Sequence, residues 1–137
     1  MSSKPPYEYG IASQRNLKSC HVLLQKIFLE VIYGYDCSIL EGYRNMEEQN
    51  IYYKQGLSNA EWPMSKHNTY PSRAIHAAPY PLDWDDIDRF LYFGGFVKGV
   101  ALKMNVALVW GGDWDGDNDF NDQDLNDYVH FELKSNG

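Results

Sequence analysis

The order of its periodic segments constrains the fold of this chain more than any other feature of the sequence. Apolar residues recur at three- and four-residue spacing from Ser13, the expected N-cap, to residue 33, and again from Asp83 or Asp85 to about residue 104. This spacing predicts two long helices. A shorter helix is expected over 46–55, and short strands are expected over 37–41, 73–78, 106–110 and 128–133. Because helices and strands do not alternate regularly, the pattern predicts an α+β fold, with helices packed on a small, mainly antiparallel sheet.

Length and composition fit one domain. The chain has 137 residues, of which 44% are hydrophobic and 15% aromatic, so it can bury enough apolar surface to fold. We expect a single domain over residues 1–137, with its core in about 13–133, and a monomer. No apolar run approaches the ~18 residues that cross a bilayer, and the first residues lack the apolar stretch of a signal peptide. We therefore expect synthesis in the cytoplasm without membrane insertion, and reduced, partly buried thiols at Cys20 and Cys37.

The net charge of −7 is concentrated in one stretch near the C-terminus. Residues 111–130 contain no Lys or Arg and hold seven aspartates, at positions 113, 115, 117, 119, 122, 124 and 127. Such a stretch repels phosphate groups, which argues against a nucleic-acid partner and against binding to an acidic membrane surface. A divalent cation is the natural counterion for it.

Three of the four histidines lie where strands could bring them together. His67 precedes an expected strand, His76 lies inside that strand, and His130 lies in the last strand, whereas His21 lies in the first expected helix and is assigned a structural role. Imidazoles that converge from separate strands are typical zinc ligands, and a catalytic zinc has three protein ligands with one open position.

Several motifs around these histidines resemble those of the phage-type peptidases among the M15 zinc metallopeptidases. They are Ser65-Lys66-His67, residues 71–80, Asp83-Trp84, residues 110–114 and residues 127–133, in the family's order. The family includes endolysins that cut the L-alanyl–D-glutamate bond of peptidoglycan and D-alanyl-D-alanine carboxypeptidases. The resemblance implies the hedgehog/DD-peptidase-like form of the α+β fold, with His67 and His130 as the first and third zinc ligands.

The sequence departs from the family at the second ligand, where the family has Asp and this chain has His76. A three-histidine site is a known arrangement for catalytic zinc, so His76 can still coordinate. The imidazole is longer and more rigid than the carboxylate, however, so His76 could instead have impaired the site. A catalytically impaired wall-binding module is therefore the alternative to an active enzyme.

The resemblance also implies roles for four further residues. Asp127 corresponds to the acidic general base, with a turn-capping aspartate as the alternative, and Arg44 to an arginine that binds a substrate carboxylate or the oxyanion. A surface arginine paired with Glu47 or Glu48 is the alternative for Arg44. Gln49 and Ser65 fall in the same motif regions and could bind the peptide backbone.

The aspartate-rich loop has the spacing of a calcium loop. Its oxygen-bearing side chains occupy positions 1, 3, 5, 7 and 12 of that spacing, namely Asp113, Asp115, Asp117, Asp119 and Asp124. The flanking segments are expected strands, which excludes an EF-hand. A second cation site, possible for Ca²⁺, and a simply hydrated acidic loop both remain open.

Together these features predict a zinc peptidase that acts on the stem peptide of bacterial peptidoglycan. The resemblance favours an endolysin that hydrolyses the L-alanyl–D-glutamate bond by zinc-activated water, with a D-alanyl-D-alanine carboxypeptidase as the alternative. Such an enzyme would be made in the host cytoplasm and reach the wall on lysis.

Overall fold

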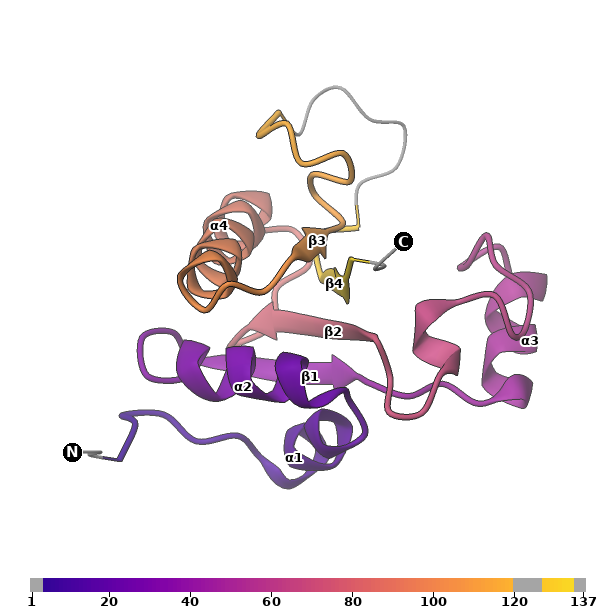
Figure 1. Ribbon diagram of the computed structural model, residues 1–137, viewed down its shortest axis with the longest axis horizontal. Coiled ribbons are helices and arrows are strands. Elements are labelled where there is room, and N and C mark those ends of the chain that lie inside the picture. Colours follow the sequence, from indigo (N-terminus) through magenta and orange to yellow (C-terminus); the bar gives the residue numbers. More distant parts are fainter. Residues whose placement is uncertain (1–3, 120–126, 135–137) are drawn as a thin grey trace.

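The computed structural model describes residues 4–119 and 127–134, and its elements follow one another in the predicted mixed order. The helices are α1 (Ile11–Lys18), α2 (Val22–Val31), α3 (Met46–Lys54) and α4 (Ile87–Lys103), together with the 3-10 turn η1 (Lys66–Asn68). The strands are β1 (Cys37–Glu41), β2 (Ala74–Pro79), β3 (Leu108–Trp110) and β4 (His130–Leu133). Figure 1 shows them as a small sheet with helices around it.

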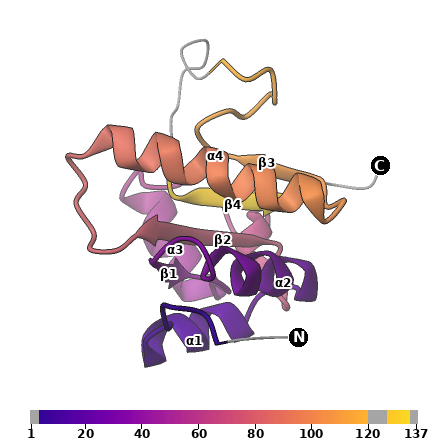
Figure 2. The same ribbon diagram turned by 90° about the vertical axis from the view of Figure 1, so that its left-hand side faces the viewer.

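The sheet has the strand order β1-β2-β4-β3, and all three pairings are antiparallel. Helices α2 and α4 pack side by side, and α1 packs along β1. Helix α3 lies on the far side of the sheet from α4, as Figures 1 and 2 show. The predicted α+β class with an antiparallel sheet is therefore confirmed.

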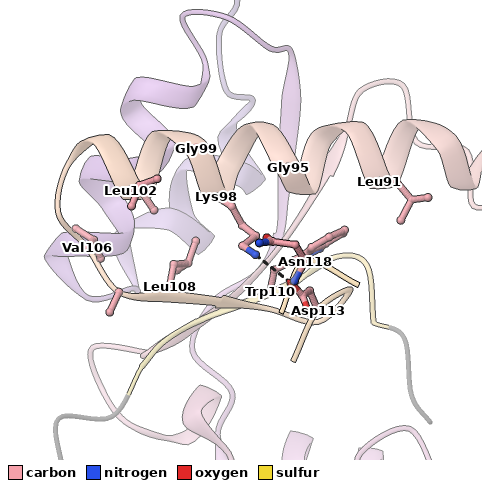
Figure 3. Close-up of a pocket in the computed structure, with 12 residues that line it drawn as sticks. Leu91, Gly95, Lys98, Gly99, Leu102, Val106, Leu108, Trp110, Asp113 and Asn118 are labelled. Atoms are coloured by element: carbon pink, nitrogen blue, oxygen red, sulfur yellow. Dashed lines mark hydrogen bonds and ion pairs between the residues drawn. The ribbon is translucent and has the colours of Figure 1, made fainter. Parts of the chain in front are cut away.

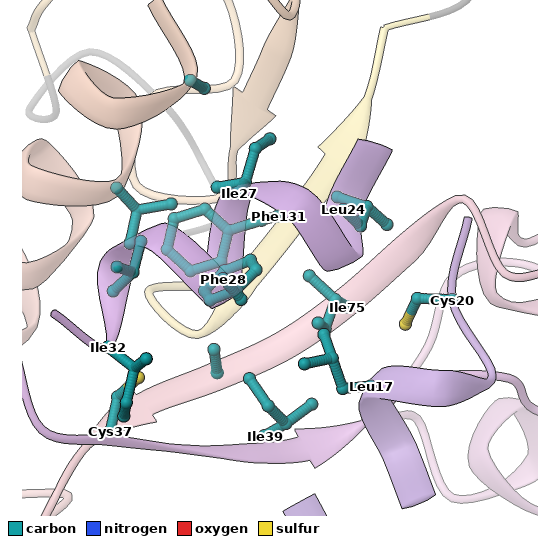
Figure 4. Close-up of a cluster of buried hydrophobic side chains, with 14 of the residues drawn as sticks. Leu17, Cys20, Leu24, Ile27, Phe28, Ile32, Cys37, Ile39, Ile75 and Phe131 are labelled. Carbon is teal, nitrogen blue, oxygen red and sulfur yellow. The ribbon is translucent and has the colours of Figure 1, made fainter. Parts of the chain in front are cut away.

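The main core fills the space between the sheet and α2 (Figure 4). Phe28 of α2 meets Phe131 of β4 edge to face, with ring centroids 5.7 Å apart. Ile75 and Ala77 of β2 are completely buried in the same cluster. Because side chains alternate along a strand, the residues between these positions, including His76 and His130, point to the opposite face.

The predicted helix over 13–33 is wrong in one respect, because the structure has two helices there. Cys20 forms a parallel bridge with Ser72, and the amide of His21 donates to the Ser72 carbonyl at 2.7 Å. The His21 side chain then caps α2 by accepting from the amide of Leu23. A contact between residues 52 positions apart in the sequence thus ends α1 and starts α2.

Two predicted caps are also different in the structure. Gly10 is the N-cap of α1, and Ser13 is instead buried, where its hydroxyl accepts a hydrogen bond of 2.9 Å from the amide of Ile39. The N-cap of α4 is Asp86, whose carboxylate accepts from the amide of Arg89. Asp83 accepts from the amide of Asp85 in the turn just before that cap.

Candidate active site

Two of the predicted ligands are direct cross-strand neighbours. His76 of β2 pairs with His130 of β4, and Nε2 of His76 lies 3.1 Å from Nδ1 of His130. His67 reaches the same point from η1, where the Ser65 hydroxyl accepts from the His67 amide and fixes the start of the turn. The amide of Arg44 donates to the His67 carbonyl at 2.8 Å, which ties the turn to the segment after β1.

The structure thus brings all three predicted histidines together. One ring nitrogen from each lies within 4.8 Å of the other two. Nδ1 of His67 donates to the Gly42 carbonyl at 2.8 Å, so its Nε2 carries a lone pair. That Nε2 is buried and has no hydrogen-bond partner among the described residues. Because buried polar atoms are normally satisfied, an unpartnered lone pair aimed at two other imidazoles fits a metal ligand.

Burial keeps these imidazoles in the form that binds metals. It lowers the pKa of His67 to about 3, with further contributions from the charges of His130 and Arg44. Burial likewise lowers the pKa of His76 well below its usual value, with the neighbouring His67 and His130 adding to the effect. Metal ligation requires neutral imidazole, so the folded site presents these two residues ready to coordinate at neutral pH.

Asp127 lies beside the histidines at the start of the turn into β4. Its Oδ2 is 4.0 Å from Nε2 of His76, and burial raises its pKa, partly offset by the charges of His130 and Arg44. Its backbone closes the turn, since its carbonyl accepts from the His130 amide at 3.1 Å. A carboxylate with a raised pKa at this place is a stronger proton acceptor than an ordinary aspartate, as a general base requires.

Arg44 is not the surface arginine of the alternative interpretation. Only 5% of its surface is exposed, and its guanidinium pairs with both carboxylate oxygens of Glu41 rather than with Glu47 or Glu48. Its Nη1 donates to Oε1 of Gln49 at 2.8 Å, and the group lies 4.2 Å above the ring of Tyr52. Arg44 therefore lines the cleft with its position fixed on several sides.

The two predicted peptide-binding side chains differ in their access to the cleft. Ser65 lines it, next to His67. Gln49 is fully buried, and its amide is satisfied by Arg44 and Asn68 on one side and by Ser58 and the Ala60 carbonyl on the other. The expectation of direct substrate contact by Gln49 is therefore corrected: it supports the cleft wall from behind.

The three histidines lie in a cleft of about 530 Å³, which we call the histidine cleft. Sequence reasoning missed several of its residues. The indole of Trp114 lies 5.2 Å from the ring of His130, centroid to centroid, and Glu132 accepts from Nε2 of His130 at 2.8 Å. The other residues that line it are Arg44, 56–60, Met64, Ser65, Lys66 and Asp127. Alternation in the last strand, which places Glu132 on the face of His130, was a usable signal for Glu132.

The aspartate-rich loop begins next to a separate groove between α4 and β3 (Figure 3). Asp113 is 3% exposed, and its Oδ2 accepts from Lys98 at 3.2 Å and from the amide of Asn118 at 2.8 Å. Carboxylate oxygens of Asp113, Asp115 and Asp117 lie within 4.8 Å of one another. Asp119 follows, with its amide bonded to Asp117, and Asp124 lies outside the described residues.

Comparison with known proteins identifies the family. The model of the phage L-alanyl-D-glutamate peptidase family matches residues 6–134. The chain belongs to this family. The resemblance inferred from the motifs is therefore confirmed. The crystal structure of the L-Ala D-Glu endopeptidase ChiX of Serratia marcescens has the same fold, with a TM-score of 0.73 and 23% identity over 93% of this chain and 90% of that one.

Proposed function

We propose that this peptidase hydrolyses the L-alanyl–D-glutamate bond of the peptidoglycan stem peptide, with a zinc ion held by His67, His76 and His130. The observation that carries the proposal is the unpartnered Nε2 of His67, buried beside two further imidazoles in a cleft of the phage L-alanyl-D-glutamate peptidase family. Three nitrogens with no carboxylate among them match the donor set of a known class of catalytic zinc sites.

When bound, zinc would supply Lewis acidity for the scissile carbonyl and for the attacking water. The chain's own residues supply the rest. Asp127 takes the proton from the attacking water and returns it to the leaving amine, for which its raised pKa is suited. Arg44 places a positive charge at the cleft wall, where the stem peptide brings carboxylates. Trp114 and Met64 provide apolar surface for the peptide.

The test is mass spectrometry of the fragments released from purified cell walls. Cleavage of the proposed bond yields peptides with a new amino-terminal D-glutamate, whereas a carboxypeptidase would release free D-alanine. Asp127→Ala should lose at least 100-fold in rate and still bind zinc, because a general base typically contributes that much. Asp85→Asn, at an exposed position before α4, is the matched control. Release of D-alanine alone would favour the carboxypeptidase, and zinc binding without any cleavage would favour the impaired wall-binding module.

We also propose a second cation, of the calcium class, at Asp113, Asp115 and Asp117. Besides the clustered carboxylates, Oδ1 of the buried Asp113 has no hydrogen-bond partner among the described residues. Calcium prefers such oxygen ligands. Terbium, which substitutes for calcium, should luminesce when the adjacent Trp114 is excited, and Asp113→Asn should remove the signal. An unaltered signal in that variant would refute the site.

The place of action is part of the same proposal. Among the described residues, no helix is both long enough and apolar enough to cross a membrane. We propose that the enzyme acts on the wall as a monomer after release from the host cytoplasm on lysis. Measurement of its mass in solution by light scattering tests the monomer.

A further inference from the structure

A β-bulge in β1 turns one carboxylate toward the histidine cleft. Ile39 pairs with Ala77, but Glu41 pairs with His76, so the register shifts by one residue between Ile39 and Glu41. Without that shift Glu41 would share the buried face of Cys37 and Ile39, because side chains alternate along a strand. The extra residue re-aims Glu41, as bulges next to active sites commonly do. Glu41, His76 and His130 consequently form one row of paired positions across three strands.

The two nitrogens of His76 face different partners along this row. Nδ1 lies 3.5 Å from Oε1 of Glu41, and Nε2 lies 3.1 Å from Nδ1 of His130. Glu132 accepts the proton on Nε2 of His130, so Nδ1 of His130 carries the lone pair and Nε2 of His76 donates to it. A metal bound by both residues needs the lone pairs on Nε2 of His76 and Nδ1 of His130. The proton on Nε2 of His76 must therefore move to Nδ1 of the same ring. Glu41 is then the acceptor that this Nδ1–H faces.

Glu41 is held where it can serve that purpose. Arg44 binds it through Nε and Nη2, and Arg44 is itself fixed by Gln49 and by the ring of Tyr52. The side chain of Glu41 is 17% exposed, so its bonds are little weakened by water. A movement of about 0.6 Å would bring its oxygen from 3.5 Å to the ordinary hydrogen-bond distance from His76.

We infer that Glu41 is a positioning residue for His76, holding the tautomer and ring orientation in which Nε2 can bind the metal. The inference rests on the proposed zinc function. It gives each of the three imidazoles an acceptor behind it: the Gly42 carbonyl for His67, Glu132 for His130 and Glu41 for His76. Outer acceptors of this kind fix ligand orientation and raise ligand basicity. Arg44 acts in this arrangement by fixing Glu41.

A double-mutant cycle on zinc affinity tests the inference without relying on activity. The four proteins are the wild type, Glu41→Gln, His76→Ala and the double variant, with zinc affinity measured by competition against a chromophoric chelator. Glu41→Gln should weaken zinc binding 10- to 100-fold when His76 is present, the usual cost of losing such a partner. In the His76→Ala background the loss should be under about threefold, because alanine has neither an N–H for Glu41 to accept nor a charge that Glu41 would repel.

Two controls separate positioning from folding. Glu47→Gln, at an exposed position in the first turn of α3, should leave zinc affinity unchanged. Glu41→Asp keeps the charge for Arg44 but withdraws the oxygens from His76, so it should weaken zinc binding like Glu41→Gln even if the latter folds poorly. The visible spectrum of bound Co²⁺ should also change in the Glu41 variants, since it reports the ligand field.

The outcomes distinguish this inference from the proposed function. A wild type that binds no zinc overturns the proposed function and with it the inference. Equal losses from Glu41→Gln in both backgrounds, or no loss in either, overturn the inference alone and leave zinc catalysis in place. A coupling of tenfold or more between positions 41 and 76 supports it.

Discussion

Replacing His76 by Asp, the residue that the motif resemblance implies at this position, should alter stability and metal binding in opposite directions. The new carboxylate would stand between two others: Glu41 lies 3.5 Å from Nδ1 of His76, and Asp127 lies 4.0 Å from Nε2. At about 4–5 Å and an effective dielectric constant of about 20, each repulsion costs about 4 kcal/mol, and Arg44 offsets roughly one of the two. The expected net cost in the absence of metal is therefore about 4 kcal/mol.

Proton uptake sets a ceiling on this cost. A carboxyl group of ordinary pKa can be protonated at pH 7 for about 4 kcal/mol, so the new side chain becomes neutral if repulsion exceeds that value. For a chain of this length we expect His76→Asp to lower the melting temperature of the zinc-free protein by about 14 °C. Zinc relieves the repulsion, so the zinc affinity of the variant should rise at least about tenfold, which corresponds to 1.4 kcal/mol.

Thermal unfolding with and without zinc at pH 7 measures both effects. We expect a lower melting temperature for the zinc-free variant, a larger upward shift on adding zinc, and faster release of wall fragments than with the wild type. An unchanged zinc-free melting temperature, together with an equal or smaller zinc shift, would show that position 76 does not face Glu41 and Asp127 as described. Slower wall hydrolysis in a variant that binds zinc more tightly would refute the view that His76 limits activity.

Two further predictions concern pH and the turn that holds Asp127. His67, with its pKa of about 3, stays neutral in the folded protein but is protonated in the unfolded chain below about pH 6.5. The zinc-free protein should therefore lose about 1.4 kcal/mol of stability per pH unit from pH 6 down toward pH 3. Urea unfolding at pH 7 and pH 5 measures this loss, and equal stabilities at the two pH values would contradict it. Gly111→Ala should reduce wall hydrolysis at least tenfold, because its Cβ would lie 2.1 Å from the Asp127 carbonyl oxygen. The control Gly95→Ala, with nothing within 4 Å of the added Cβ, should retain activity and gain up to about 1 kcal/mol of stability, and equal activities of the two variants would refute the role of Gly111.

Local patterns predicted the elements in which buried and exposed residues follow one simple period. The alternation of residues 128–133 predicted a strand with His130 and Phe131 on opposite faces, and β4 has this arrangement. The break between α1 and α2 was not predictable in this way. Residues 17–24 keep helical spacing because Leu17, Cys20 and Leu24 all enter the core, and the chain leaves the helix only because Cys20 bridges to Ser72.

The three histidines of the candidate site were predictable from the sequence, but the residues that support them were not. Motif resemblance and strand alternation together pointed to His67, His76 and His130, which the structure brings to one place. Glu41 was missed because simple alternation assigns it to the core side of β1, and the bulge that reverses it leaves no mark in the local sequence. The partners of Arg44 were missed for a related reason: Glu41 becomes its partner only once that bulge has turned the carboxylate, while Glu47 and Glu48 are equally near in sequence.

The pattern of satisfied and unsatisfied atoms explains why a metal should stabilise this fold. The carbonyl of Gly42 accepts a hydrogen bond from Nδ1 of His67, and the carboxylate of Glu132 accepts one from Nε2 of His130. Burial of the two rings therefore leaves neither of these N–H groups without a partner. Nε2 of His67, by contrast, is buried and has no hydrogen-bond partner among the described residues, and an unsatisfied buried acceptor costs about 1–3 kcal/mol. A ligand that binds this lone pair removes the cost, and it favours the folded chain because folding brings the three imidazoles together. Zinc should therefore stabilise the wild type more than it would stabilise a site in which only His76 and His130 bind the metal.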